Sequence, residues 1–136
     1  MWDGNERRGK KRYGVKNSTV RYVKAGLLAF LSNYSDRYLL LNISEGGLHF
    51  ITRDELAPGV SLKLLLGFPD VESPIAAKGV VVWSVKSKEH DAFRTGLRIT
   101  GIGSKALRQL RFVLENTLLD NVKVTTGIYL REIERL

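Results

Sequence analysis

Five basic side chains stand within six positions near the start of the chain, in the segment NERRGKKRYG at residues 5–14. Three of them, Arg7, Arg8 and Arg12, are arginines, whose planar guanidinium can grip phosphate oxygens or a guanine edge with two parallel hydrogen bonds. A cluster of this kind also raises the local concentration of anions. The pattern predicts either a solvated charged tail or an anion-binding arm, and taken alone it favours the tail.

A second segment, LLLNISEGGLHF at residues 39–50, places small polar residues at the end of a predicted strand. Asn42 and Ser44 are two positions apart, so in an extended chain their side chains point to the same face. Gly46 and Gly47 permit a positive φ or a close approach of a ligand to the backbone. Taken alone, the segment is equally typical of a bulged turn between two strands.

The sequence gives little support to catalysis or metal binding. His49 and His90 have no partner at metal-ligand spacing and are interpreted as structural. There is no cysteine, so neither a disulfide nor a thiolate site is available. The segment GLRITGIGSK has Gly96 and Gly101 at phosphate-loop spacing, but Ile102 stands where that loop needs a lysine. We therefore predict no enzyme, no metal and no cofactor.

Length and composition indicate one domain of ordinary globular character. The chain has 136 residues, of which 43% are hydrophobic and 26% charged. Its apolar runs are too short to span a bilayer, and no apolar signal segment follows the N-terminus. We therefore expect a soluble, cytoplasmic protein without membrane contact. Of the net charge of +8, residues 1–24 contribute +6, from eight basic and two acidic side chains.

The elements that must position these residues are mostly strands. Short segments rich in aliphatic and aromatic residues are separated by turn sequences. The predicted strands are STVRYV, GLLAFL, YLLLNI, GLHFIT, VSLKLLLGF, AAKGVVVWSV and RTGLRIT. This spacing predicts an antiparallel barrel or sandwich. From Ser104 the period changes, and leucines at steps of three and four predict an amphipathic helix over 104–119. The tail, residues 121–136, could be a strand, a helix or a self-association element, so a homodimer is left open.

The two polar segments together resemble the PilZ domain family. RGKKR fits the RxxxR motif of that family and NISEGG fits its (D/N)xSxxG motif, while AKGVVVWSV and FRTGLRI resemble its later strands. The resemblance covers residues 6–118. The residues that carry the motifs are Arg7, Arg8, Arg12, Asn42, Ser44 and Gly47.

The resemblance implies an all-β fold, a six-stranded antiparallel PilZ-like β-barrel over 14–103 with the C-terminal helix after it. It implies a bacterial receptor for the second messenger cyclic di-GMP (c-di-GMP). In this family a flexible basic arm, here residues 1–13, wraps the ligand, and the second motif lies on the barrel surface beneath it. A receptor without an attached effector domain must signal by ligand-induced docking to another protein, whose identity the sequence does not reveal.

The chemistry of the motif residues suits such a ligand, which offers two phosphates and two guanines. Arginine can pair with guanine O6 and N7 bidentately, and Asn42 and Ser44 can hydrogen-bond a guanine edge from a strand. Gly47 is expected to leave room for the ring. Trp83 could form an apolar wall against a guanine, but a place in the barrel core is favoured because large aromatics dominate small cores. Arg98 is interpreted as a solvated strand residue.

Two other classes of function remain as alternatives. An oligonucleotide-binding module of the OB type would interleave basic and aromatic residues across a strand face. Here the basic residues concentrate in the arm and the aromatics are scattered among apolar neighbours, so nucleic acid is disfavoured as a partner. A protein-interaction adaptor of the PilZ fold would have lost its ligand, but both motifs are intact. One ligand molecule or a stacked pair would fit the same motifs.

Overall fold

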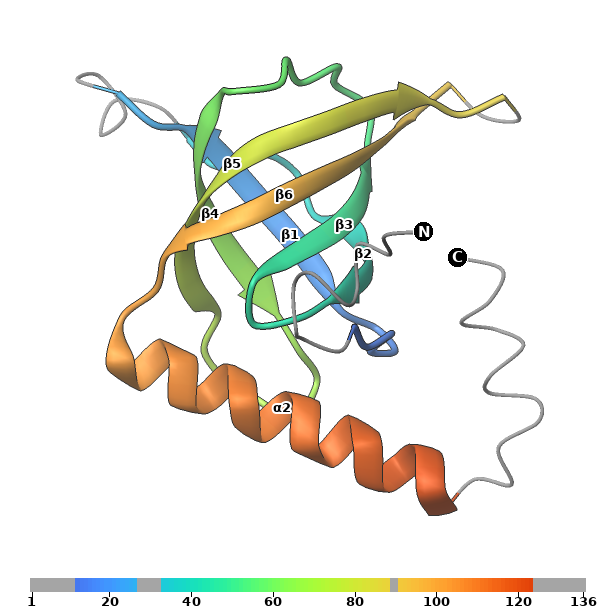
Figure 1. Cartoon of the computed structure of the whole chain (residues 1–136), viewed down its shortest axis with the longest axis vertical. Coiled ribbons are helices and arrows are strands. Elements are labelled where there is room, and N and C mark those ends of the chain that lie inside the picture. The colour runs from blue at the N-terminus through green and yellow to red at the C-terminus, as the bar shows by residue number, and fades with distance from the viewer. Residues whose placement is uncertain (1–11, 27–32, 89–90, 124–136) are drawn as a thin grey trace, which may run out of the picture.

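The structure is a computed structural model that describes residues 12–26, 33–88 and 91–123. Its described part is a closed barrel of six strands followed by one helix (Figure 1). All strand pairings are antiparallel, and the order around the barrel is β1-β2-β3-β6-β5-β4. The elements are β1 (Thr19–Lys24), β2 (Tyr38–Ile43), β3 (Gly47–Thr52), β4 (Ser61–Gly67), β5 (Ile75–Lys86), β6 (Phe93–Gly101) and α2 (Ser104–Lys123).

Alternation along the strands fills the barrel interior. In β4, Leu62, Leu64 and Leu66 point inward and are buried, while the residues between them are at least partly exposed. Phe50 of β3 and Ile43 of β2 are fully buried in the same core cluster. Each such side chain stabilises the fold by about 1.5–3 kcal/mol through the removal of apolar surface from water.

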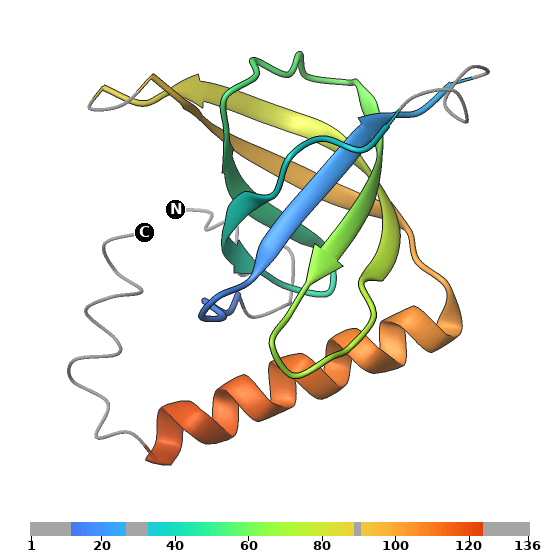
Figure 2. The ribbon, with the colours of Figure 1, turned by 180° about the vertical axis from the view of Figure 1, so that it is seen from behind.

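Helix α2 covers one end of the barrel, beneath the β2–β3 turn and the β4–β5 loop (Figures 1 and 2). Its apolar side chains at steps of three and one, Leu110, Val113 and Leu114, are buried and join the core cluster. The amphipathic pattern thus closes the barrel end that carries the NxSxxG turn.

The predicted six-stranded antiparallel barrel with a C-terminal helix is confirmed. The strands YLLLNI and GLHFIT have the predicted bounds, whereas α2 continues four residues beyond the predicted 119, to Lys123. Most of GLLAFL, residues 1–11 of the predicted arm and residues 124–136 of the tail lie outside the described residues. The last two residues of the predicted arm are held against the barrel, because Tyr13 and Ile43 exchange backbone hydrogen bonds of 2.8 and 2.9 Å.

Candidate functional site

An open pocket of about 890 Å³ lies where the β2–β3 turn meets the β5–β6 ribbon. This volume is within the range of small-molecule sites. None of the described residues that line the pocket is acidic, and three are arginines. The lining residues are Arg12, Asn42, Gly46, Gly47, Leu48, His49, Val82, Trp83, Arg94, Gly96, Leu97, Arg98 and Ile99.

Arg12 and Asn42 join the two sequence motifs directly. Nη1 of Arg12 donates a hydrogen bond of 2.9 Å to Oδ1 of Asn42, across a sequence separation of 30. The neighbouring bridge between Tyr13 and Ile43 fixes the chain at this point, so the guanidinium is delivered to the pocket by a paired segment of backbone. The sequence led us to expect Arg12 in a mobile arm that closes only around a ligand, whereas here Arg12 contacts Asn42 directly. Arg7 and Arg8 lie outside the described residues.

Ser44 serves the turn. Its side chain has 0% exposure, and its Oγ accepts hydrogen bonds of 3.2 Å from the backbone N–H groups of Gly46 and Gly47. Its own N–H donates to the carbonyl of Gly47 at 2.8 Å. The expectation that Ser44 faces a ligand-accessible surface alongside Asn42 is thus wrong, because the chain turns after Ile43 and the strand alternation ends there. Ser44 therefore stabilises the β2–β3 turn, whose residues Gly46 and Gly47 line the pocket.

Gly47 allows two strands to approach closely. A Cβ at this position would lie 2.5 Å from the carbonyl oxygen of Leu97 on β6, which is closer than real Cβ contacts come. Gly47 also lines the pocket, but its missing side chain would point toward the partner strand. The absence of a side chain therefore lets the backbone of β6 approach, while the expected room for a guanine ring at Gly47 stays a prediction.

His49, predicted to be structural, lies in the pocket wall between two groups that carry N–H donors. Its Nδ1 is 3.2 Å from Nδ2 of Asn42, and Nε of Arg94 points at its Nε2 over 3.3 Å. A neutral imidazole accepts at one ring nitrogen only, and a protonated one at neither. Burial, and then the charges of Arg94 and Arg12, lower the pKa of His49 to about 4. The ring is therefore neutral at pH 7.

We expect His49 to make the fold less stable as the pH falls from about 6.5 towards about 4. In that window the unfolded chain binds a proton at His49 and the folded protein does not, so the free energy of unfolding decreases. The loss should be about 1 kcal/mol between about pH 7 and about pH 5.5. It is measured by urea unfolding of the wild type and of His49→Gln. Equal pH dependence in the two proteins would contradict the assignment.

Trp83 lies on the outer wall. It is 37% exposed, lines the pocket, and its ring meets His49 in an edge contact with centroids 4.9 Å apart. The predicted place in the barrel core is therefore wrong. The cause is a register shift between Val81 and Trp83, which leaves Val81 buried and turns both following side chains outward. The indole sits directly over Gly96 of β6, where a Cβ would overlap Nε1 and Cε2 of the ring.

Gly96→Ala should therefore displace the indole of Trp83 from the pocket wall. With Trp2→Phe as background, the fluorescence of Trp83 is expected to shift to longer wavelength as the ring becomes more solvated. Gly101→Ala is the matched control on the same strand, because a Cβ there meets Lys78 at an ordinary 3.6 Å. An unchanged spectrum in Gly96→Ala would show that the indole does not depend on the bare face of Gly96.

Two arginines of β6 complete the positive lining of the pocket. Arg94, Gly96 and Arg98 alternate along the strand, so they share its outer face, and all three line the pocket. Arg98, interpreted from the sequence as a solvated residue, thus belongs to the site, and Arg94 was missed. The signal available in the sequence was the R-x-G-x-R spacing, which predicts two cations on either side of a bare backbone position.

The motif turn is also tied to the helix. Nε and Nη2 of Arg111 in α2 both donate to Oε1 of Glu45, at 3.2 and 3.1 Å. Glu45 lies between Ser44 and Gly46 in the turn. The negative charge of Glu45 is therefore balanced by Arg111 of α2. Glu45 is not among the residues that line the positive pocket.

The described residues contain no gathering of three or more His, Asp or Glu side chains that could hold a metal ion. They also include no helix that combines the length and the apolar character needed to cross a membrane.

Comparison with solved structures finds the same barrel in several bacterial proteins. The PilZ domain of YcgR from Escherichia coli, solved with c-di-GMP, has a TM-score of 0.60 and 12% identity, covering 89% of this chain and 98% of that one. The MrkH–c-di-GMP complex of K. pneumonia has a TM-score of 0.64 and 13% identity over 84% of this chain and 53% of MrkH. MotI/DgrA, the inhibitor of motility of Bacillus subtilis, has a TM-score of 0.57 and 22% identity over 74% and 47%.

This chain spans about half the length of the MrkH and MotI chains that it matches. At these sequence identities, the structural similarity shows the shared fold alone. No curated protein sequence matches the chain. The sequence itself matches the family model of the PilZ domain over residues 6–115, which is most of its length. With the closed six-stranded barrel and the helix at its end, the chain belongs to the PilZ domain family.

Proposed function

We propose that this protein is a receptor that binds c-di-GMP in the pocket beside the β2–β3 turn, and that it signals by docking to a partner protein. The hydrogen bond between Arg12 and Asn42 carries the proposal, because it brings the last arginine of RxxxR to the first residue of NxSxxG. The PilZ domain of YcgR and MrkH, which share the fold, were solved with c-di-GMP.

The chemistry of the pocket supports this ligand. The guanidinium groups of Arg12, Arg94 and Arg98 line it without an acidic residue among the described lining, which suits a dianion. Arginine forks also match the O6 and N7 acceptors of guanine. The indole of Trp83 offers an apolar face at the pocket wall, against which a purine can stack.

The oligonucleotide-binding alternative finds less support. Trp83 is the single Trp, Tyr or Phe among the described lining residues, whereas single strands are bound on a succession of aromatic platforms. A compact ligand with two purines and two phosphates fits one stacking wall between three arginines better.

Isothermal titration calorimetry with c-di-GMP tests the proposal and gives affinity and stoichiometry together. We expect saturable binding that weakens as salt concentration rises, since the ligand is a dianion and the lining is positive. GMP, ATP and a short single-stranded DNA are the comparison ligands. If one of these binds as tightly as c-di-GMP, the proposed specificity is wrong.

Ligand binding should also protect the basic segment from protease. Arg7, Arg8, Lys10 and Lys11 are trypsin sites, and a ligand held by Arg8 and Arg12 against Asn42 would shield the bonds that follow them. We expect slower cleavage of the wild type at saturating c-di-GMP, and no such protection in Asn42→Ala. Equal cleavage rates with and without ligand would contradict closure of the segment over the ligand, even with binding confirmed.

A further inference from the structure

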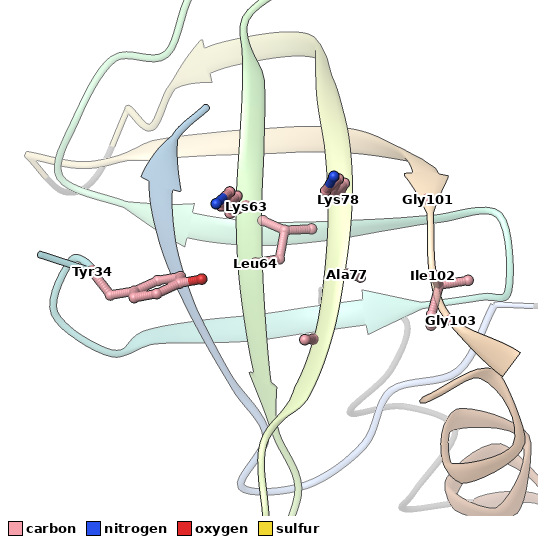
Figure 3. Close-up of a pocket in the computed structure, with 9 residues that line it drawn as sticks. Tyr34, Lys63, Leu64, Ala77, Lys78, Gly101, Ile102 and Gly103 are labelled. Atoms are coloured by element: carbon pink, nitrogen blue, oxygen red, sulfur yellow. The ribbon is translucent and has the colours of Figure 1, made fainter. Parts of the chain in front are cut away.

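A second concave surface lies on the barrel wall over β4, β5 and the end of β6. It has a volume of about 460 Å³ and shares no lining residue with the pocket described above. Figure 3 shows Lys63 on β4 and Lys78 on β5 projecting side by side, with Tyr34 on one flank and the segment after β6 on the other. This lysine groove is lined by Tyr34, Lys63, Leu64, Ala76, Ala77, Lys78, Gly101, Ile102 and Gly103.

The two lysines repel one another in the free protein. Lys63 and Lys78 are direct partners in the β4–β5 register, and like charges directly opposite on neighbouring strands are destabilising. Within the described residues, neither forms an ion pair with an acidic side chain. An anionic group bound between the two would replace this repulsion by two attractions.

The barrel wall offers nothing of its own to neutralise them. The six strands contain no aspartate or glutamate, and their seven basic residues are Arg21, Lys24, Lys63, Lys78, Lys86, Arg94 and Arg98. The described acidic residues are confined to loops and to α2. The wall is therefore complementary in charge to an acidic partner.

The lining next to the two lysines is apolar, because Leu64 and Ala77 form the adjacent pair in the β4–β5 register. Leu64 and Ala77 are buried beneath it, and Ile102 is half-buried beside it. The stem of Lys78 lies along the bare face of Gly101, and the space beside Gly103 is open to at least 4 Å. Tyr34 is the one aromatic residue in the described lining, so the groove lacks the row of stacking platforms on which single-stranded nucleic acids bind.

We propose that the lysine groove docks an acidic segment of a partner protein, in which carboxylates meet Lys63 and Lys78 while an apolar side chain packs beside them, near Ile102. The binding depends on the groove alone. The further idea that the lysine groove passes the c-di-GMP signal to the partner rests on the proposed function. Because β5 and β6 line both the groove and the ligand pocket, the partner would dock on strands that also contact the ligand.

The test uses a fluorescein-labelled peptide of alternating glutamate and leucine, titrated with the full-length protein by fluorescence anisotropy. Lys63→Gln and Lys78→Gln should each weaken binding about two- to five-fold, the range of an exposed ion pair. The matched control is Lys86→Gln, an exposed lysine further along β5, which should change nothing. The comparison probes are a positively charged lysine–leucine peptide and an oligodeoxynucleotide with the same negative charge as the glutamate–leucine peptide.

Two results would overturn the proposal. One is an equal loss of binding in Lys86→Gln, which would mean that the peptide responds only to net charge. The other is tighter binding of the oligodeoxynucleotide with the same dependence on Lys63 and Lys78. Affinity for c-di-GMP, measured in the same variants, should stay at the wild-type value. Failure of c-di-GMP binding with intact peptide binding would refute the proposed function and leave the groove standing.

Discussion

Replacing Arg12 by alanine is expected to weaken c-di-GMP binding by about 1–3 kcal/mol, which is about five- to 150-fold in the dissociation constant. The loss has two parts. In the proposed complex the guanidinium donates to guanine or phosphate, and its hydrogen bond to Asn42 orients the amide of that residue at the pocket. Arg12→Lys should recover little of the affinity, because an ammonium group cannot reproduce the planar fork.

Calorimetry of the two variants should be paired with thermal melts of the free proteins. Loss of the Arg12–Asn42 hydrogen bond should lower the free energy of unfolding by about 0.5–1.5 kcal/mol, so the variants should remain folded with a modestly lower melting temperature. Arg53→Ala is the matched control, since Arg53 is exposed and follows β3 at the end remote from Gly47. Wild-type affinity in Arg12→Lys would show that the pocket responds to charge alone.

Gly47→Ala is expected to act on the fold first. The added Cβ would lie 2.5 Å from the carbonyl oxygen of Leu97, and a backbone atom in a closed barrel cannot swing away as a side chain can. Strain of this kind costs about 1–3 kcal/mol, and occasionally more. The free energy of unfolding, measured with urea, should fall by that amount, with c-di-GMP affinity reduced as the β3–β6 pairing shifts.

Gly103→Ala provides the comparison, because a Cβ there meets no atom within 4 Å. We expect its stability to stay close to that of the wild type. Wild-type stability in Gly47→Ala would mean that β6 can move aside, and the glycine of the motif would then need an explanation through the ligand.

The strands and the helix could be predicted because their periods are simple. β2 and β3 were predicted at their observed bounds, since turn residues flank YLLLNI and GLHFIT on both sides. The family motifs implied that Arg12 and Asn42 serve one site, but the direct hydrogen bond between them was not predicted. His49 was interpreted only as structural, because its pairing with Asn42 depends on the register of the β2–β3 hairpin.

The errors concern positions where the backbone departs from a regular strand. The register shift before Trp83 turned a residue assigned to the core into part of the pocket wall, and alternation cannot reveal a bulge. Ser44 lies where the strand has already become a turn, so its hydroxyl pairs with the backbone of Gly46 and Gly47. The space at Gly47 is set by β6, about 50 residues away in sequence, which no local pattern encodes.

The most direct test of the proposed c-di-GMP pocket is a nitrogen–proton NMR titration of the protein with that ligand. The predicted result is that the signals shifted most are the indole N–H of Trp83 and the backbone amides around Asn42, Gly47 and Arg94. The amides of Lys63 and Lys78 in the lysine groove should respond little. Shifts centred on the lysine groove, or no shifts at saturating ligand, would contradict the assignment of the pocket.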